Sequence, residues 1–291
     1  MKNRSGVVRR GPGLLSCIGV LLIGSVSHAA TPAPNLLSID APRHAAKDPP
    51  PPAESLPRAP AAPLAQSPVV RPSFNIDPSL PAEVEPNGTP AQATPLALSA
   101  GGAAHVVGNV YPNGDLDFYS FTAAAGDRVY VAMQASASAS GSNDGVLELY
   151  ASDGTTLVEG DEDDGSFGSL SPSIAGATLP AAGTYYLRVR HSAATAQLRP
   201  YHLYFQLRSG TPVAETEPND ASPGPALPAG GWVSGEIASA TDVDFHSISL
   251  NAGDTVFLSL DQDPERNGDA NLRLGLGVFD GQILVVNDNG A

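Results

Sequence analysis

The residues of this sequence best suited to chemistry are carboxylates in closely spaced pairs. A Glu-x-Glu motif and an Asp-x-Asp-Phe motif each occur twice, and residues two apart in an extended chain project to the same side. If the pairs of one half meet in the fold, they surround one point with hard oxygen ligands, which suits Ca²⁺. Without a cation, carboxylates so close would repel one another. The alternative is that these motifs form turns and strand starts with solvated side chains. The pairs are Glu83 and Glu85, Asp115 and Asp117, Glu215 and Glu217, and Asp242 and Asp244.

The sequence lacks the common signatures of catalysis. It holds no His-Glu-x-x-His, no Gly-x-Ser-x-Gly and no Gly-rich phosphate loop. His246 and Ser247 are neighbours, but adjacent strand residues face opposite ways and cannot easily hydrogen bond. Paired carboxylates can serve a glycosidase, yet a set repeated in both halves fits a structural ion better than two identical active sites. The acidic run at 161–164 lacks the spacing of an EF-hand and indicates a solvated loop. We therefore expect no enzyme within these residues.

The charge and the cysteine content exclude further classes of function. From Glu83 onward the chain has 26 Asp and Glu residues against seven Arg and no Lys. A field of that sign repels phosphate backbones, so no nucleic-acid partner is expected. Cys17 is the only cysteine, and it lies in a segment that we expect to be removed. The mature protein is therefore expected to have no disulfide and no cysteine-ligated metal.

The first 82 residues have the composition of an export signal and a tether. Residues 1–29 combine a basic start, the apolar run 14–26 and small residues at a cleavage site, which predicts a secretory signal peptide. The alternative is a lipoprotein signal, because Leu-Leu-Ser-Cys17 superficially resembles a lipobox. Residues 30–82 hold half of the 28 prolines and no sustained period, which predicts an extended, disordered linker. We expect a secreted or periplasmic protein that does not span the membrane once the signal is cleaved.

The remainder of the chain is internally repeated. The run Glu-x-Glu-Pro-Asn begins at Glu83 and again at Glu215, 132 residues later. Asp-x-Asp-Phe begins at Asp115 and again at Asp242, and Ala-Gly-Asp-x-Val at Ala125 and again at Ala252; both pairs are 127 residues apart. An offset kept across several motifs indicates a tandem duplication. The predicted modules are residues 83–209 and residues 213–291, and the second ends before the equivalents of the last strands of the first.

Each module is predicted to be all-β. The runs at 129–134, 184–190 and 201–207 alternate apolar and polar residues between Gly, Asp, Asn and Ser clusters, as strands with one buried face do. A further strand is expected near 173–178. No segment keeps a helical period for three turns. The pattern favours antiparallel β-sandwich or jelly-roll modules in tandem. If the strands near 184–190 and 201–207 pair, their outward side chains form one strip suited to an extended polymer. This predicted ligand surface comprises Tyr186, Arg188, Arg190 and Tyr204.

The ordered motifs, together with Gly-Thr-Tyr-Tyr-Leu-Arg-Val at 183–189, closely resemble the bacterial pre-peptidase C-terminal domain. The resemblance covers 83–207 fully and 215–291 in part. It implies a β-sandwich appended to secreted peptidases and other exported enzymes. It also implies similarity to the collagen-binding domains of clostridial collagenases, where Ca²⁺ binds between the N-terminal linker and the sandwich. By resemblance, the metal ligands are Glu215, Glu217, Asn219, Asp220, Asp242 and Asp244 in the second module, and Glu83, Glu85, Asn87, Asp115 and Asp117 in the first. Gly88 stands where the second module has Asp220, so the first site is expected to be the weaker.

These observations predict a secreted, non-catalytic accessory or binding protein stabilised by Ca²⁺. It would assist an exported hydrolase, such as a host peptidase, or bind an extracellular protein or polysaccharide polymer. One alternative is that the sequence is the N-terminal part of a secreted peptidase or other hydrolase whose catalytic domain follows residue 291. Another alternative is a structural cell-surface protein.

Overall fold

The computed structural model describes residues 80–135, 144–163, 170–239, 242–250 and 256–261, together with the short strands 18–21, 274–277 and 283–287. Apart from the single 3-10 turn η1 (Pro90–Gln92), the regular structure of these residues is β-strand. None of the helices in the described part of the chain is long and apolar enough to cross a membrane. The predicted signal peptide and linker lie outside the described residues, except for strand β1 (Ile18–Leu21) and residues 80–82.

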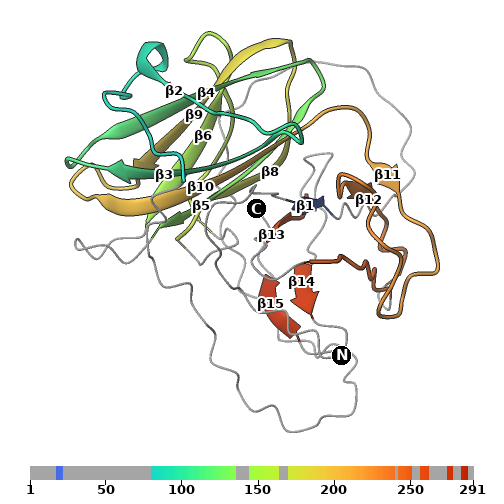
Figure 1. Cartoon of the computed structure of the whole chain (residues 1–291). Coiled ribbons are helices and arrows are strands. Elements are labelled where there is room, and N and C mark those ends of the chain that lie inside the picture. Colours follow the sequence, from blue (N-terminus) through green and yellow to red (C-terminus); the bar gives the residue numbers. More distant parts are fainter. Residues whose placement is uncertain are drawn as a thin grey trace, which may run out of the picture. The chain divides into compact units, whose positions relative to one another are not determined.

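Residues 94–208 form two stacked β-sheets (Figure 1). One sheet has four strands in the order β3-β10-β5-β8, and the other has five in the order β2-β4-β9-β6-β7. All pairs within these sheets are antiparallel except the short parallel pair of β2 and β4. The strands are β2 (Thr94–Pro95), β3 (Ala103–Val110), β4 (Leu116–Ala123), β5 (Arg128–Ala135), β6 (Gly145–Tyr150), β7 (Leu157–Asp161), β8 (Ser173–Thr178), β9 (Gly183–His191) and β10 (Leu198–Arg208). The predicted all-β, antiparallel sandwich is confirmed.

The core lies between the two sheets because each strand turns alternate residues inward. In β9, Tyr185, Leu187 and Val189 are buried while their neighbours are partly exposed. They meet side chains of the opposite sheet, such as Met133 of β5. The rings of Phe121 in β4 and Phe205 in β10 approach to 4.7 Å between centroids. Contacts of this kind join the two layers into one hydrophobic cluster.

The Ala-Gly-Asp motif is the turn between β4 and β5. Gly126 has a φ of +84°, a conformation that residues with a Cβ avoid. The carboxylate of Asp127 accepts a hydrogen bond from the backbone N–H of Ala124 at 2.8 Å, which closes the turn. Gly and Asp therefore recur here because the backbone conformation and an exposed N–H require them.

The described strands after residue 210 are short and pair in twos. β11 (Val213–Ala214) pairs with β12 (Val233–Ser234), and β14 (Leu274–Gly277) with β15 (Ile283–Asn287). β13 (Val256–Ser259) pairs with β1. The described residues of the segment 213–247 repeat several backbone hydrogen bonds of the opening of the sandwich.

Candidate metal centre

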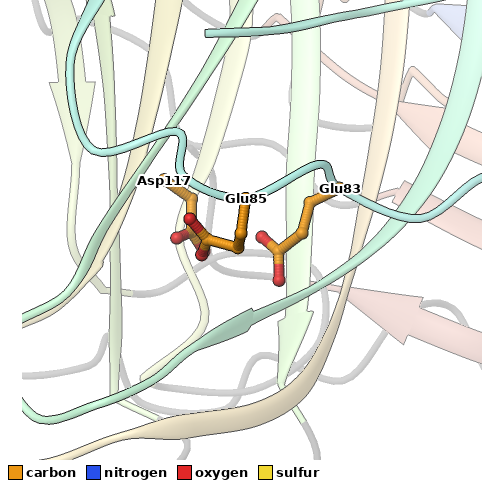
Figure 2. A group of neighbouring side chains, drawn as sticks. All are labelled: Glu83, Glu85 and Asp117. Atoms are coloured by element: carbon orange, nitrogen blue, oxygen red, sulfur yellow. The ribbon is translucent and has the colours of Figure 1, made fainter. Parts of the chain in front are cut away.

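Three of the predicted carboxylates meet at the opening of the sandwich. Glu83 and Glu85 lie on the segment that leads into η1, and Asp117 is the second residue of β4. Figure 2 shows their side chains directed toward one another. One carboxylate oxygen of each lies within 4.8 Å of one oxygen of each of the others. Residues more than 30 positions apart in the sequence thus contribute to one cluster.

Backbone hydrogen bonds fix this arrangement. The N–H of Glu83 donates to Val107 O at 3.0 Å, and the N–H of Phe118 donates to Asn87 O at 2.9 Å, so the opening segment lies against both β3 and β4. The Glu83 carboxylate accepts a hydrogen bond from the N–H of Asn109 at 2.6 Å, and the Glu85 carboxylate accepts one from the N–H of Asn87 at 2.9 Å. The two glutamates are therefore positioned before any ligand binds.

Two buried oxygen atoms at the cluster have no hydrogen-bond partner. Asn87 and Asp117 are both fully buried, and neither Asn87 Oδ1 nor Asp117 Oδ1 accepts a hydrogen bond. A buried acceptor without a partner costs about 1–3 kcal/mol. One cation placed among the carboxylates would satisfy both atoms, so the donor set fits a metal ion.

The electrostatics of the cluster also favour a cation. Burial, reinforced by the charge of Glu83, raises the pKa of Asp117 to about 9. Burial likewise raises the pKa of Glu83. With a pKa of about 9, the Asp117 carboxyl holds a proton at neutral pH unless another positive charge replaces it. A divalent ion is such a charge.

Asp115 is the predicted ligand that the structure does not bring into this group. Its carboxylate accepts hydrogen bonds from the backbone N–H groups of Tyr111 and Leu116, both at 3.0 Å. The first aspartate of Asp-x-Asp therefore closes the turn before β4, while the second points into the cluster.

The segment 213–247 reproduces this hydrogen-bond pattern. The N–H of Phe245 donates to Asn219 O at 3.0 Å, and the N–H of Glu215 donates to Ser234 O at 2.8 Å. The Glu217 carboxylate accepts the N–H of Asn219 at 2.9 Å. The partner atoms correspond to those around Glu83, Glu85 and Asn87.

The second half brings together more carboxylates than the first. One group comprises Glu215, Glu217 and Asp244, and an adjoining group comprises Glu217, Asp220 and Asp242. Asn219 Oδ1 and Asp244 Oδ1 are buried without a hydrogen-bond partner, as are their counterparts in the first half. Burial, followed by the charge of Glu215, raises the pKa of Asp244 to about 7. Asp220 occupies the position of Gly88 in the first half, and its carboxylate belongs to the second of these groups.

Sequence reasoning missed three residues that contact these clusters. The hydroxyls of Tyr119 and Tyr201 lie 2.5 Å apart, and Tyr201 donates a hydrogen bond to Asp117 Oδ2 at 2.7 Å. In the second half, His246 Nε2 lies 4.0 Å from Glu215 Oε2. Tyr119 and His246 each follow the phenylalanine of Asp-x-Asp-Phe, so a comparison of the two repeats at that position could have identified them. Tyr201 left no such signal because its position lies 84 residues from Asp117.

The predicted polymer-binding strip is wrong as a single surface. Tyr186, Arg188 and Arg190 do share the outward side of β9. However, β9 pairs with β4 and β6, whereas β10 pairs with β3 and β5 in the other sheet. Tyr204 of β10 stacks on His105 at 4.3 Å between ring centroids. The chain between β9 and β10 crosses from one sheet to the other, so their outward faces point to opposite sides of the sandwich.

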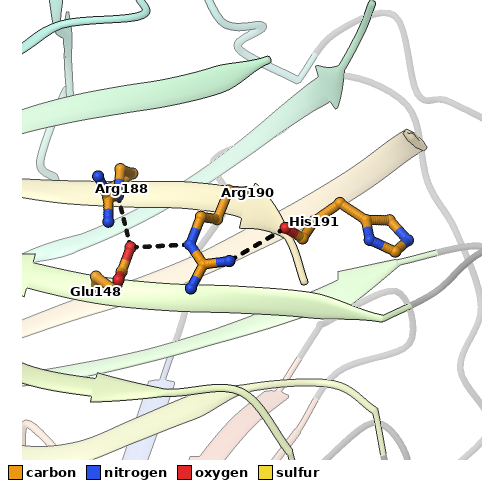
Figure 3. A network of polar contacts seen from close by, with 4 residues as sticks. All are labelled: Glu148, Arg188, Arg190 and His191. Atoms are coloured by element: carbon orange, nitrogen blue, oxygen red, sulfur yellow. Dashed lines mark hydrogen bonds and ion pairs between the residues drawn. The ribbon is translucent and has the colours of Figure 1, made fainter. Parts of the chain in front are cut away.

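The two arginines of β9 are also engaged within the sheet. Glu148 of β6 accepts hydrogen bonds from Arg188 Nε at 2.5 Å and from Arg190 Nε at 3.3 Å, as Figure 3 shows. The guanidinium of Arg188 lies over the ring of Tyr150, 5.1 Å from its centroid. These cations contribute to cross-strand pairing in the five-stranded sheet.

The fold and the cluster define a class of protein module: a small antiparallel β-sandwich whose opening segment brings carboxylates to the start of strand β4. Comparison with protein families agrees with this class. Residues 115–191 match the family described as "Bacterial pre-peptidase C-terminal domain", which confirms the resemblance for the part of the sandwich from β4 to β9.

Individual relatives include a curated protein of Deinococcus radiodurans named "Probable subtilase-type serine protease". The two are 36% identical over 106 residues, which is 36% of this chain and 14% of the length of that protein. Among solved structures, the Aeromonas hydrophila periplasmic inhibitor of g-type lysozyme is 19% identical, with 40% of this chain and 96% of that chain covered and a TM-score of 0.30. The pre-peptidase C-terminal domain of the Bacillus anthracis collagenase is 16% identical, with coverages of 39% and 94% and a TM-score of 0.29.

Proposed function

We propose that residues 83–209 form a calcium-stabilised, non-catalytic accessory module of an exported protein. The observation that carries this proposal is the convergence of Glu83, Glu85 and Asp117 around buried Asn87 and Asp117 oxygens that have no hydrogen-bond partner. Hydrogen-bond donors reach both oxygens of Glu83, Oε2 only at 3.4 Å, and one oxygen of Glu85. Buried Asp117 Oδ1 has no donor, so it is the oxygen most in need of a cation. Ca²⁺ would link the opening segment to β4.

The donor chemistry supports Ca²⁺ over softer or smaller ions. The cluster offers carboxylate and amide oxygens, which are hard ligands. Calcium binds oxygen at about 2.3–2.6 Å, so oxygens on opposite sides of one ion lie about 5 Å apart. One carboxylate oxygen of each residue in the group lies within 4.8 Å of those of the others, close enough for a single ion of this size to contact them. Backbone carbonyls or water would complete the shell.

We infer that the segment from 213 onward begins a second module of the same kind, with Glu215, Glu217, Asn219, Asp220, Asp242 and Asp244 as ligands. The support is the repetition of the same donor and acceptor atoms around Asn219 and Phe245. The additional carboxylate of Asp220 is expected to make this second site the tighter one, since calcium affinity rises with the number of charged ligands.

The biological role proposed for these modules is to accompany an exported hydrolase. The relative named as a subtilase-type serine protease supports this, since it contains a region 36% identical to part of the present chain. The partner would be a peptidase or other hydrolase, on the same chain or a separate one. Binding of an extracellular polymer stays a prediction, now confined to the outward side of β9, where Tyr186, Arg188 and Arg190 lie.

Calorimetric titration of the mature chain with Ca²⁺ tests the proposal. We expect two binding events in the wild type and the loss of one in Asp117→Asn. Asp153→Asn is a matched control, because Asp153 is an exposed carboxylate that serves only a local turn. Gly88→Asp should tighten the weaker event, and its Cβ would lie an ordinary 3.6 Å from Leu116 O. Binding that is absent from the wild type, or unaffected by Asp117→Asn, would refute the calcium site of the first module.

A further inference from the structure

The two carboxylate clusters differ at one position that faces the ligands. Phe118 and Phe245 occupy equivalent places, because the N–H of each donates to the carbonyl of the asparagine in its own Glu-Pro-Asn motif. The next residue is Tyr119 in the first half and His246 in the second. The two sites therefore carry a phenol and an imidazole, respectively, at the same point of the backbone.

The phenol of the first half is fully engaged in hydrogen bonds. Tyr119 is completely buried, and its hydroxyl lies 2.5 Å from that of Tyr201 and donates to Glu83 Oε2 at 3.4 Å. The Tyr119 hydroxyl therefore helps to hold the Glu83 carboxylate in place by a hydrogen bond. A phenol of raised pKa is a poor metal ligand, and burial raises the pKa of Tyr119 well above its ordinary value.

The imidazole of the second half has no such engagement. The His246 side chain is 6% exposed, and its Nε2 is buried without a hydrogen-bond partner. This nitrogen lies 4.0 Å from Glu215 Oε2. The Glu215 carboxylate is itself held in place, since its Oε1 accepts the N–H of Glu236 at 2.5 Å and its Oε2 accepts Asn219 Nδ2 at 3.1 Å.

We propose that His246 Nε2 is a metal ligand of the second site, and that this site accepts a first-row transition ion, of which Zn²⁺ is the test case. This inference rests on the proposed function. Imidazole nitrogen favours zinc and its neighbours, whereas carboxylates alone favour calcium, magnesium and manganese. Zinc binds nitrogen and carboxylate oxygen at about 2.0–2.2 Å, so two ligand atoms on one ion lie about 3–4 Å apart. The separation of His246 Nε2 from Glu215 Oε2 falls at the wide end of this range.

The rest of the donor set is compatible with the same ion. Asn219 Oδ1 and Asp244 Oδ1 are the other buried atoms of this cluster that lack a hydrogen-bond partner. One amide oxygen, one imidazole nitrogen and two carboxylates supply four ligands. The first site lacks the nitrogen and is therefore expected to discriminate strongly against zinc.

Isothermal titration of the mature chain with Zn²⁺ and, separately, with Ca²⁺ tests this proposal. His246→Tyr installs the residue that the first half carries, and His246→Gln is a smaller second variant in case the tyrosine does not fit. His191→Gln is the matched control, since His191 is another buried histidine of the chain and is not a member of any of the carboxylate groups. We expect both His246 variants to weaken one Zn²⁺ event by about tenfold or more, while Ca²⁺ affinity stays within about threefold of the wild type.

A second readout reports the bond itself. In protein labelled with ¹⁵N-histidine, the His246 Nε2 resonance is identified by its absence from the His246 variants. Zn²⁺ should shift this resonance and leave the His191 resonances in place. Zn²⁺ affinity unchanged in both variants would overturn the inference while leaving calcium binding intact. Zn²⁺ and Ca²⁺ affinities that fall together would also overturn it, because they would show His246 acting only as an ion-pair partner of Glu215. Failure of Ca²⁺ to bind the wild type would refute the proposed function instead.

Discussion

Glu148 shows how this acidic protein places its few arginines. Its carboxylate lies between Arg188 and Arg190, with 14% of the side chain exposed. Burial alone would raise its pKa, but the hydrogen bond and charge of Arg188 and the charge of Arg190 outweigh burial and lower the pKa of Glu148. The stabilisation is therefore present above the ordinary pKa of glutamate and is lost as the pH falls through the lowered value.

Glu148→Gln should destabilise the sandwich by roughly 1–2 kcal/mol at pH 7, between the values typical of exposed and of buried ion pairs. The variant leaves two guanidinium groups side by side without a counter-charge. Urea unfolding at several pH values measures the effect, and the difference from the wild type should shrink toward pH 4. Arg190→Gln keeps the shorter ion pair, so it should cost less; an equal or larger cost would contradict this account.

At the scale of elements, strands were predictable from the sequence and their pairing was not. The runs expected near 173–178, 184–190 and 201–207 correspond to β8, β9 and β10. Alternating burial, a local property of a strand, is clearest in β9. Which sheet a strand joins depends on its connection. Residues 192–197 carry the chain from one sheet to the other, and nothing in their composition distinguishes such a crossing from a hairpin. Tyr204 was misplaced for that reason.

The carboxylate cluster was predictable for a related reason. Residues two apart in an extended segment share a side, which brought Glu83 and Glu85 together correctly. The same rule failed for Asp115, because the turn before β4 takes its carboxylate for two backbone N–H groups. Turn chemistry competes locally for carboxylates, and the sequence does not show which of two aspartates the turn takes.

A second connection between the sheets, from β7 to β8, holds a titratable group. Asp161 ends β7 in the five-stranded sheet, and its Oδ2 accepts the N–H of Ser173, the first residue of β8 in the other sheet, at 2.6 Å. Burial raises the pKa of Asp161 to about 7. A folded-state pKa above the unfolded value means that the folded protein holds the proton more tightly, so this group lowers stability as the pH rises from about 4 to 7.

The stability of Asp161→Asn relative to that of the wild type should therefore increase as the pH rises. The amide keeps an acceptor for Ser173 and has no charge to bury. We expect the thermal midpoint of the variant to rise relative to that of the wild type between pH 5 and pH 8. The change in relative stability over this range is a few kcal/mol at most, since each pKa unit corresponds to about 1.4 kcal/mol. A variant whose relative stability falls with rising pH would show that the carboxylate is needed in its charged form.

At the scale of the whole molecule, one complete hydrophobic cluster accounts for the first module. Its buried members run from Leu96 to Phe205 and include residues of both sheets. No disulfide can contribute, because Cys17 is the only cysteine. Stability must therefore come from packing, hydrogen bonds and any ion that links the opening segment to β4.

Residues 80–210 expressed alone should unfold in a single cooperative transition, since they contain the whole of that cluster. Ca²⁺ should raise the midpoint and a chelator should reverse the increase, because an ion that binds only the folded state stabilises it. Circular dichroism and intrinsic tyrosine fluorescence, recorded on the same sample, provide the check. Transitions that fail to coincide would mean that the module depends on residues outside this range.

The position of the carboxylates has a mechanical consequence. Among the described residues from 80 onward, the stretch 81–87 is the first to engage the sandwich, through the bridge of Ala82 to Val107 and the hydrogen bonds around it. Tension arriving from the N-terminal side pulls on this stretch before it reaches any strand of the two sheets. Coordinate bonds from Glu83 and Glu85 to an ion shared with Asp117 would carry that load into β4 and the interior, so the module would resist being peeled open from its end.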